Sequence, residues 1–381
     1  MNPVVYEALP TKRVYSDYSA LSAIEAELDR TARSRAFILS SASLAGAVGP
    51  VAAIATSLGE RCAAVGTALS RHTPLQSVVD MAAFAREQQA DLLVSIGGGS
   101  VIDGTKAVKA ALGADLHRTS DFEKYSLGRA GSIALPEGGP PILAVPTTLS
   151  AAEFTSTAGY TDPQSGLKEG VRGRHLAARS VVLDPELALK TPISLWLSSG
   201  CRSIDHAVEG LFSPRIAPAL QNQAATGLAL LAKGLRAAHR RPDNRVARRK
   251  CQQAVWLISD CCIHLTMGAS HGLGYLLGTI AKVDHGMTSA VLLPEVTSWN
   301  AETFPERAKV VADALGSETA ADGLRQLFAD IGMPNGIGAL GADQSVIERI
   351  VNLAPTHPVV AANPRPFAND AEFRALLERA W

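Results

Sequence analysis

The sequence predicts an α/β domain over residues 1–187 followed by an all-helical domain over residues 188–381. In the first part, short apolar runs alternate with helical patterns as far as Asp184. This alternation is typical of βαβ units, whose strands pair in a mainly parallel sheet. Beyond Pro185 the apolar spacing fits helices, and no strand-like alternation is present. The change of pattern places the domain boundary near residue 187.

Five apolar runs are the expected strands of the first domain. They are Ala36–Ser40, Arg61–Val65, Asp91–Ile96, Ile142–Val145 and Ser180–Leu183. The Gly/Pro-rich residues 128–141 have the composition of a surface loop. In the second domain, the Ala/Leu-rich segments Ala219–His239 and Asn244–Met267 are expected to form long helices.

Composition argues against several classes of partner. The 381 residues carry 36 basic and 36 acidic side chains, so no nucleic-acid or anionic-membrane partner is expected. The N-terminus lacks the basic start and apolar run of a signal peptide, and no stretch reaches the roughly 18 apolar residues of a membrane span. We therefore expect a cytoplasmic protein. The five cysteines are an odd number without CxxC spacing, which favours buried reduced thiols over disulfides or a zinc site.

A glycine run predicts a nucleotide site in the first domain. The expected strand Asp91–Ile96 leads into Gly97, Gly98 and Gly99, and a helix capped by Ser100 is expected to follow. Bare backbone N–H groups at a helix N-terminus can hold a pyrophosphate. A structural tight turn is the alternative, because the run is not a GxGxxG fingerprint.

Two hydroxyl side chains form a second motif at a strand end. Thr147 and Thr148 follow the expected strand Ile142–Val145. They would lie at the carboxyl edge of the sheet, which is the edge where α/β proteins bind ligands. A helix cap is the alternative interpretation of these two hydroxyls.

These motifs, with others further along the chain, resemble the iron-containing (group III) alcohol dehydrogenase family over nearly the whole sequence. In order they are Gly97 to Lys106, Pro146-Thr147-Thr148, Asp184-Pro185, His206 to Glu209, His271 to Gly278, Asp284-His285-Gly286 and Asn363 to Pro366. Peripheral segments resemble the maleylacetate reductases of that family, namely Met1-Asn2-Pro3, Tyr6 to Pro10, His72-Thr73-Pro74 and Arg374 to Trp381. The resemblance implies a dehydroquinate synthase-like fold, with a dinucleotide-binding N-terminal domain and a helical catalytic domain, in a homodimer.

The resemblance also implies which residues contact the coenzyme, NADPH or NADH. The glycine motif would hold the pyrophosphate through Gly97, Gly98, Gly99 and Ser100. Thr147 and Thr148 would contact the nucleotide, and Asp103 would also belong to the coenzyme site. Ser41 stands where NAD-preferring members have an Asp near the adenosine ribose. Because no carboxylate there would repel a 2′-phosphate, we expect NADPH to be accepted at least as well as NADH.

The chain departs from the family at the metal positions. His206, His271 and His285 match three ligand histidines, and these three would hold a metal if one were bound. Arg202 stands at the position of the Asp ligand, which maleylacetate reductases tend to replace by Asn, and Tyr275 replaces a fourth histidine. A guanidinium offers no lone pair, and its repulsion of a unit charge at ~4 Å is about 4 kcal/mol at an effective dielectric near 20. We therefore expect no functional metal.

Arg202 is expected to bind an anion instead. A guanidinium can hold a carboxylate through two parallel hydrogen bonds, or stabilise the charge that develops on an enolate. The alternative is a structural salt bridge between Arg202 and Asp205, Glu209 or a neighbouring helix. Asp205 itself is not expected to replace the missing ligand, because adjacent helical residues point about 100° apart.

The expected activity is metal-independent, NAD(P)H-dependent reduction of a small unsaturated or oxo-carboxylic acid, as in maleylacetate reductase. His206, His271 and His285 keep acid–base potential without a metal, and His271, His285 or Tyr275 would return a proton after hydride transfer. One alternative is a metal-dependent alcohol or aldehyde dehydrogenase that tolerates Arg202. Another is a redox-silent family member that acts as a lyase, a cyclase or a binding protein.

Overall fold

The computed structural model describes residues 6–7, 10–70, 73–163, 166 and 168–381. The segment Met1-Asn2-Pro3 and the residue His72, which contributed to the resemblance, lie outside the described residues. Contacts divide the chain into two compact units. One runs from Ala8 to Thr191, and the other comprises Pro192–Trp381 together with the N-terminal residues as far as Glu7.

Tyr6 explains why the start of the chain groups with the second unit. Its hydroxyl donates a hydrogen bond to the carbonyl of Arg215 (2.5 Å) and accepts one from the N–H of Ala217 (2.9 Å). The first unit ends at Thr191, whereas the sequence placed the boundary near residue 187. The Thr191 hydroxyl donates to the carbonyl of Thr147 (2.7 Å), and this bond ties the residues after 187 to the first unit.

The first unit contains a six-stranded sheet in which every neighbouring pair of strands is parallel. In spatial order the strands are β1 (Arg13–Ser16), β8 (Ser180–Leu183), β5 (Ile142–Pro146), β4 (Leu92–Gly97), β2 (Ala36–Ser40) and β3 (Cys62–Gly66). The mainly parallel sheet is therefore confirmed. The strand β1 was not predicted, because it contains no apolar run, and neither was the antiparallel pair β6 (Thr157–Thr161) and β7 (Lys168–Arg172).

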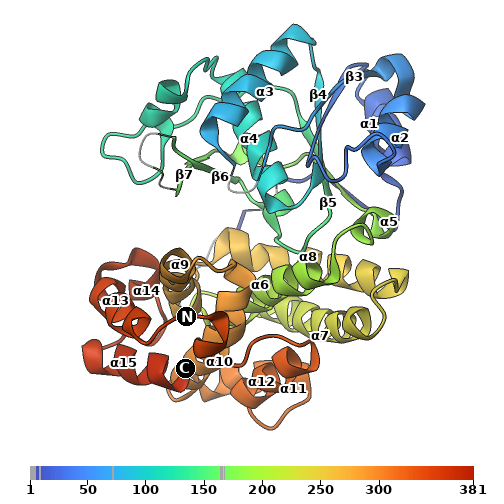
Figure 1. Ribbon diagram of the computed structural model, residues 1–381. Helices are drawn as coiled ribbons and strands as arrows, with labels where there is room; N and C mark the ends of the chain where they lie inside the picture. Colours follow the sequence, from blue (N-terminus) through green and yellow to red (C-terminus); the bar gives the residue numbers. More distant parts are fainter. Residues whose placement is uncertain (1–5, 8–9, 71–72, 164–165, 167) are drawn as a thin grey trace. The chain divides into compact units, whose positions relative to one another are not determined.

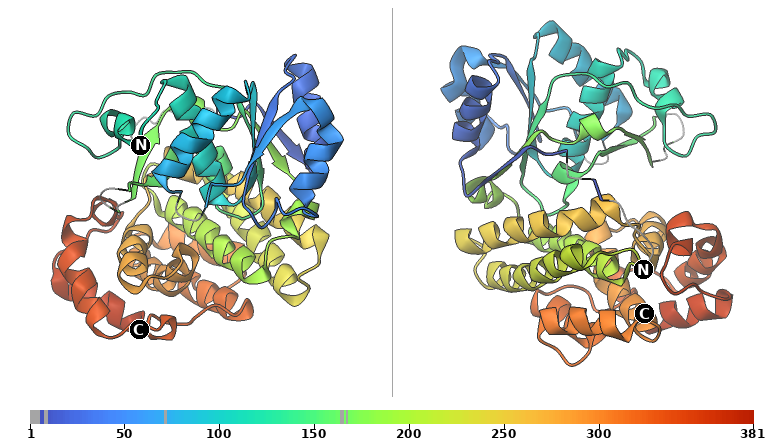
Figure 2. Two further views of the ribbon diagram at one scale, coloured as in Figure 1. Left: turned by 45° about the horizontal axis from the view of Figure 1, so that its top comes forward. Right: turned by 180° about the vertical axis from the view of Figure 1, so that it is seen from behind.

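Helices cover both faces of this sheet (Figures 1 and 2). The helices α1 (Ala20–Arg30) and α2 (Pro50–Leu58) lie on one face, and α3 (Leu75–Glu87) and α4 (Gly99–Gly113) lie on the other. Strands β2, β4, β5 and β8 are buried along their whole length. Burial on both faces explains why these strands appear in the sequence as continuous apolar runs. The short α5 (Pro185–Ala188) ends the unit.

Three neighbouring strands end at the same edge of the sheet. The strand β4 pairs with β2 on one side and with β5 on the other, and all three run in parallel. Ser41 directly follows β2, Gly98 directly follows β4, and Thr148 lies shortly after β5. The topology therefore brings the predicted nucleotide contacts to one carboxyl edge.

The described residues of the second unit form helices and no strand, which confirms the all-helical prediction. The helices are α6 (Ile193–Phe212), α7 (Pro218–Arg240), α8 (Arg245–His264), α9 (Ala269–Ala281), α10 (His285–Ala301), α11 (Pro305–Leu315), α12 (Ala320–Asp330), α13 (Ser345–Leu353), α14 (Pro358–Ala361) and α15 (Asp370–Arg379). The helix α6 packs against α7, α8 and α10, while α9, α10 and α13 to α15 share one apolar core. The helix α8 ends before the predicted Met267, because Leu265 already has an extended backbone.

The cysteines are all free, as expected. Cys201, Cys251 and Cys261 are buried, whereas Cys62 and Cys262 are only partly buried. Among the described residues, no helix combines the length and the apolar character needed to cross a membrane.

Candidate functional site

The glycine motif forms an uncapped helix N-terminus. The helix α4 begins at Gly99 with Gly98 as its N-cap, and within the described residues it has no side-chain capping hydrogen bond. The expectation that Ser100 caps this helix is therefore wrong, because Ser100 already lies inside the first turn. The N–H groups left without a side-chain acceptor are the groups that can bind a phosphate oxygen.

A side chain in place of Gly98 or Gly99 would come too close to neighbouring side chains. A Cβ atom on Gly98 would lie 3.0 Å from the Thr148 methyl group and 3.3 Å from the Thr148 hydroxyl. A Cβ atom on Gly99 would lie 2.9 Å from the Ser150 hydroxyl. Bare backbone flanked by hydroxyl groups fits the pyrophosphate of a dinucleotide, which a tight turn alone would not require.

The two threonines do not cap a helix. Both are buried, and the Thr147 N–H donates to the carbonyl of Gly97 (2.9 Å). The next helical turn, the 3₁₀-helix η3 (Ala152–Phe154), begins beyond them with Ala151 as its N-cap. The helix-cap interpretation is therefore wrong, and a contact with the nucleotide stays a prediction for Thr147 and Thr148.

Ser41 and Asp103 complete the predicted coenzyme residues. The Ser41 hydroxyl lies 3.0 Å from that of Ser43 beyond the end of β2. Asp103 forms an ion pair with the fully buried ammonium of Lys106 (3.1 Å), which also donates to the Thr155 hydroxyl (2.8 Å). Asp103 thus has a structural partner, and its contact with a coenzyme stays a prediction.

A second group of predicted residues gathers in the helical unit. Arg202 and His206 lie one turn apart on α6, His271 and Tyr275 one turn apart on α9, and His285 begins α10. The His206 and His271 rings stack with centroids 4.9 Å apart. Tyr275 lies between His271 and His285. Its ring centroid is 6.4 Å from that of His271 and 5.4 Å from that of His285. All five predicted residues therefore belong to one cluster.

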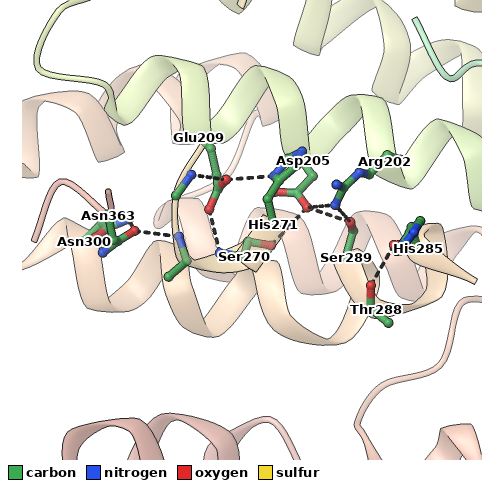
Figure 3. Close-up of polar contacts among 12 residues, drawn as sticks. Arg202, Asp205, Glu209, Ser270, His271, His285, Thr288, Ser289, Asn300 and Asn363 are labelled. Atoms are coloured by element: carbon green, nitrogen blue, oxygen red, sulfur yellow. Dashed lines mark hydrogen bonds and ion pairs between the residues drawn. The ribbon is translucent and has the colours of Figure 1, made fainter. Parts of the chain in front are cut away.

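Glu209 joins α6 to the first turn of α9. Its carboxylate accepts the N–H of Gly268 (2.7 Å) and the N–H of Ser270 (2.6 Å), while Asn363 accepts that of Ala269 (3.0 Å). Figure 3 shows Glu209 on α6 facing this turn. A buried carboxylate at a helix N-terminus also interacts favourably with the helix dipole. The arrangement fixes the start of α9 and hence the position of His271.

His271 lies between two buried carboxylates. Its Nδ1 is 2.8 Å from Glu209 and 3.2 Å from Asp205 Oδ1. A carboxylate can only accept hydrogen bonds, so Nδ1 carries a hydrogen and donates a hydrogen bond to Glu209. Burial and Arg202 lower the pKa of His271, but Asp205 and Glu209 outweigh them and raise it. The Nε2 atom is buried and has no hydrogen-bond partner within the described residues.

Asp205 is fully buried and holds three helices together. Its Oδ2 accepts hydrogen bonds from the Ser289 hydroxyl (2.6 Å) on α10 and from the Ser270 hydroxyl (3.1 Å) on α9 (Figure 3). Burial alone would raise the pKa of Asp205. The positive charges of His271 and Arg202 and the Ser289 hydrogen bond outweigh burial, so that the pKa falls to about 2.

Within the described residues, the polar contacts of the Arg202 guanidinium are long. Its Nη1 lies 3.4 Å from Asp205 Oδ2 and 3.4 Å from the Ser289 hydroxyl, and its guanidinium lies 5.1 Å from the centre of the Tyr275 ring. The salt bridge to Asp205 thus exists, while Glu209 is occupied at α9. Both polar contacts use Nη1, and among the described residues neither Nε nor Nη2 has a hydrogen-bond acceptor.

The histidines do not fit the expected family metal. Among the described residues, Asp205, Glu209 and His271 are the one group with three ligand atoms within 4.8 Å of one another, and His206 and His285 do not belong to it. In that group, His271 Nδ1 already donates a hydrogen bond to Glu209. In addition, burial and the charges of His271 and Arg202 lower the pKa of His206 well below its ordinary value. The positive charge of Arg202 thus acts on His206, one of the three histidines that would hold a metal.

Sequence reasoning missed three residues of this site. It named Asp205 and Glu209 as possible partners of Arg202, but not as the two carboxylates that hold His271. Their spacing on one helix was the available signal, whereas their partner on α9 lies more than 60 residues away. His357, whose ring centroid lies 6.1 Å from that of Tyr275, carried no signal in the sequence.

Comparison with known proteins identifies the family. Residues 10–185 match the family model for iron-containing alcohol dehydrogenase, and residues 197–381 match the model for the C-terminal part of the Fe-containing alcohol dehydrogenase family. The chain therefore belongs to the iron-containing alcohol dehydrogenase family.

Several relatives of known identity are maleylacetate reductases. That of Burkholderia cepacia is 32% identical over 382 residues, which cover 100% of this chain and 98% of the relative. The crystal structure of maleylacetate reductase from Agrobacterium tumefaciens has a TM-score of 0.85 at 28% identity, covering 100% of this chain and 99% of the other. Sulfoacetaldehyde reductase from Bifidobacterium kashiwanohense, at 22% identity and a TM-score of 0.87 over 99% of this chain and 98% of its own, shares the fold. The chain is thus a family member close to maleylacetate reductase and an NAD(P)H-dependent oxidoreductase, as predicted.

Asp205→Asn is expected to lower the free energy of unfolding by about 2–4 kcal/mol at pH 7, because two positive charges lose their buried partner. The folded pKa of Asp205 lies below its ordinary value near 3.9. The stabilisation is therefore fully present above about pH 4 and is lost as the pH falls towards the folded pKa. Urea titrations from pH 7 to the lowest pH at which both proteins stay folded measure the difference.

Asp313→Asn is the matched control for this titration. Asp313 is exposed and pairs with Lys309 on α11, so its removal is expected to change stability by less than about 1 kcal/mol. A difference between wild type and Asp205→Asn that stays the same at every pH would contradict the assignment of an ionised Asp205.

Proposed function

We propose that this protein is a metal-independent, NAD(P)H-dependent reductase of a small unsaturated or oxo-carboxylic acid, with maleylacetate as the first candidate substrate. The observation that carries the proposal is Arg202, whose guanidinium lies 5.1 Å from the centre of the Tyr275 ring and whose Nε and Nη2 have no acceptor among the described residues. A fixed cation with free donors favours a substrate carboxylate and opposes a metal ion. The similarity to maleylacetate reductases points to the same class of substrate.

The coenzyme is assigned to the carboxyl edge of the parallel sheet. The uncapped N-terminus of α4 and the hydroxyls of Thr148 and Ser150 suit a pyrophosphate. Ser41 at the end of β2 presents no negative charge to the adenosine ribose, which supports the use of NADPH as well as NADH. When bound, the coenzyme supplies a hydride from C4 of its nicotinamide to the substrate carbon.

The residues of the helical unit have the properties that the other half of the reduction needs. Arg202 would hold the substrate carboxylate or the enolate that forms when the hydride arrives. His271 would then donate the proton from Nε2, because Asp205 and Glu209 favour its protonated form. His206, whose pKa is lowered, is neutral and does not serve as an acid at neutral pH. Tyr275 and His285 would complete the walls around the reacting group.

Arg202→Gln is expected to lower kcat/KM for the carboxylate substrate by about 100-fold or more, because two charge-assisted hydrogen bonds are lost. Oxidation of NADPH and NADH would be followed by the loss of the reduced nicotinamide's absorbance, with maleylacetate, other oxo- and enoic acids, and uncharged aldehydes as substrates. Arg236→Gln is the control, since Arg236 pairs with Asp330 on the surface. Preferential turnover of uncharged aldehydes by the wild type, or full activity of Arg202→Gln, would contradict the proposal.

Ser41→Asp is expected to weaken NADPH binding about tenfold or more relative to NADH, because the new carboxylate would repel the 2′-phosphate. Ser41→Asn has a similar size without the charge and is expected to preserve the preference of the wild type. Dissociation constants of both coenzymes, measured by fluorescence titration, check the outcome. If Ser41→Asp and Ser41→Asn change the dissociation constants of NADPH and NADH by the same factor, Ser41 does not lie near the ribose.

A further inference from the structure

The short helix α14 lies directly against α9. A Cβ atom on Gly272 would come within 2.4 Å of the Val360 side chain and within 2.7 Å of the Val360 backbone nitrogen. Gly272 is therefore needed for this approach, since a larger residue would push α14 away. Tyr275 lies three residues after Gly272 and so occupies the same side of α9. The residue that precedes α14, His357, is thereby carried towards Tyr275.

Asn363 fixes the other end of this segment. Its Oδ1 accepts the N–H of Ala269 at the start of α9 (3.0 Å). Its Nδ2 donates to Asn300 Oδ1 on α10 (2.8 Å) and to the carbonyl of Arg365 (2.7 Å). Figure 3 shows Asn363 beside Asn300. The segment between His357 and Asn363 is thus held at α14 by close packing and at its end by a buried amide, so the place of His357 is set by the fold.

His357 and Arg202 both border the ring of Tyr275. The centroid of the His357 ring lies 6.1 Å from that of Tyr275, and the Arg202 guanidinium lies 5.1 Å from the same centroid. Tyr275 remains 37% exposed, so the ring is not closed off by these neighbours. Arg202 on α6 and His357, which precedes α14, therefore both border the accessible ring of Tyr275.

His357 has an unused polar atom. Its Nδ1 is buried and has no hydrogen-bond partner in the described part of the chain. Burial lowers the pKa of His357, so its ring is neutral at pH 7 and one nitrogen carries a hydrogen. A buried polar atom without a partner is costly unless a ligand or water satisfies it. The His357 ring thus brings a buried nitrogen that lacks a partner among the described residues to within 6.1 Å, between ring centroids, of the partly exposed Tyr275 ring.

We propose that His357 binds a second carboxylate of the substrate, by donating a hydrogen bond from Nδ1, while Arg202 binds the first. The inference rests on the proposed function for the carboxylate at Arg202. It assigns a binding residue to the second carboxylate of a dicarboxylic substrate such as maleylacetate. Tyr275 forms the apolar surface between the two anionic ends.

Three substitutions of His357 test the proposal. An Asn amide nitrogen can take the place of Nδ1, a Gln amide nitrogen reaches instead towards Nε2, and Phe keeps the ring without a donor. His357→Phe and His357→Gln are expected to raise KM for the dicarboxylate about tenfold or more, with kcat little changed, whereas His357→Asn keeps a KM close to that of the wild type. The monomethyl ester that lacks the second charge is expected to show the same KM with all four proteins.

His264→Phe is the matched control, because His264 contacts Tyr6 and Asp260 away from the Tyr275 ring. An equal loss for the dicarboxylate and its ester in His357→Phe, or no change in KM, would overturn the proposal. Calorimetric binding of the dicarboxylate to wild type and to His357→Phe tests the same contact without turnover. If the wild type reduces no carboxylate, the proposed function fails, whereas a tenfold difference in that binding would still support His357 as the anion contact.

Discussion

The carboxylate of Glu209 is the contact on which the helical site depends. It binds two N–H groups at the start of α9 and the Nδ1 of His271, so one side chain sets both the helix and the imidazole that the helix carries. Asp205, one turn earlier on α6, reaches α9 and α10 through Ser270 and Ser289. A buried carboxylate without hydrogen-bond partners is costly. These hydrogen bonds therefore fix the spacing of α6, α9 and α10. The acid–base properties of His271 follow from that spacing.

Arg202 decides what this framework can bind. The Arg202 guanidinium lies on the same helix as Asp205 and Glu209, and its fixed positive charge would repel a divalent ion bound beside it. A carboxylate would instead replace the long contacts of Arg202 at 3.4 Å with shorter, charge-assisted hydrogen bonds. In the proposed function, the arginine that stands at the position of the family's Asp ligand both removes a metal ligand and provides an anion contact.

The coenzyme half could be predicted in more detail than the helical half. Apolar runs and glycines are local signals, so five strands and the glycine turn were found, although Gly98 and not Ser100 is the N-cap of the helix. Strand β1 carries a weak local pattern, and its pairing with β8 joins distant parts of the chain. The roles of Glu209 and His357 depend on contacts with α9 and on the close approach at Gly272, which spacing along the sequence does not encode. Family resemblance located the histidines, but only the structure located their partners.

Metal content measured together with activity tests the central claim most directly. The purified enzyme would be incubated with Zn²⁺ or Fe²⁺, dialysed and analysed for metal, and its turnover of the carboxylate substrate would be compared with and without chelator. The account predicts far less than one ion per chain and the same turnover in both conditions, because the Arg202 guanidinium occupies the place of an anionic ligand. One tightly bound ion per chain, with activity lost to the chelator and restored by the metal, would contradict it.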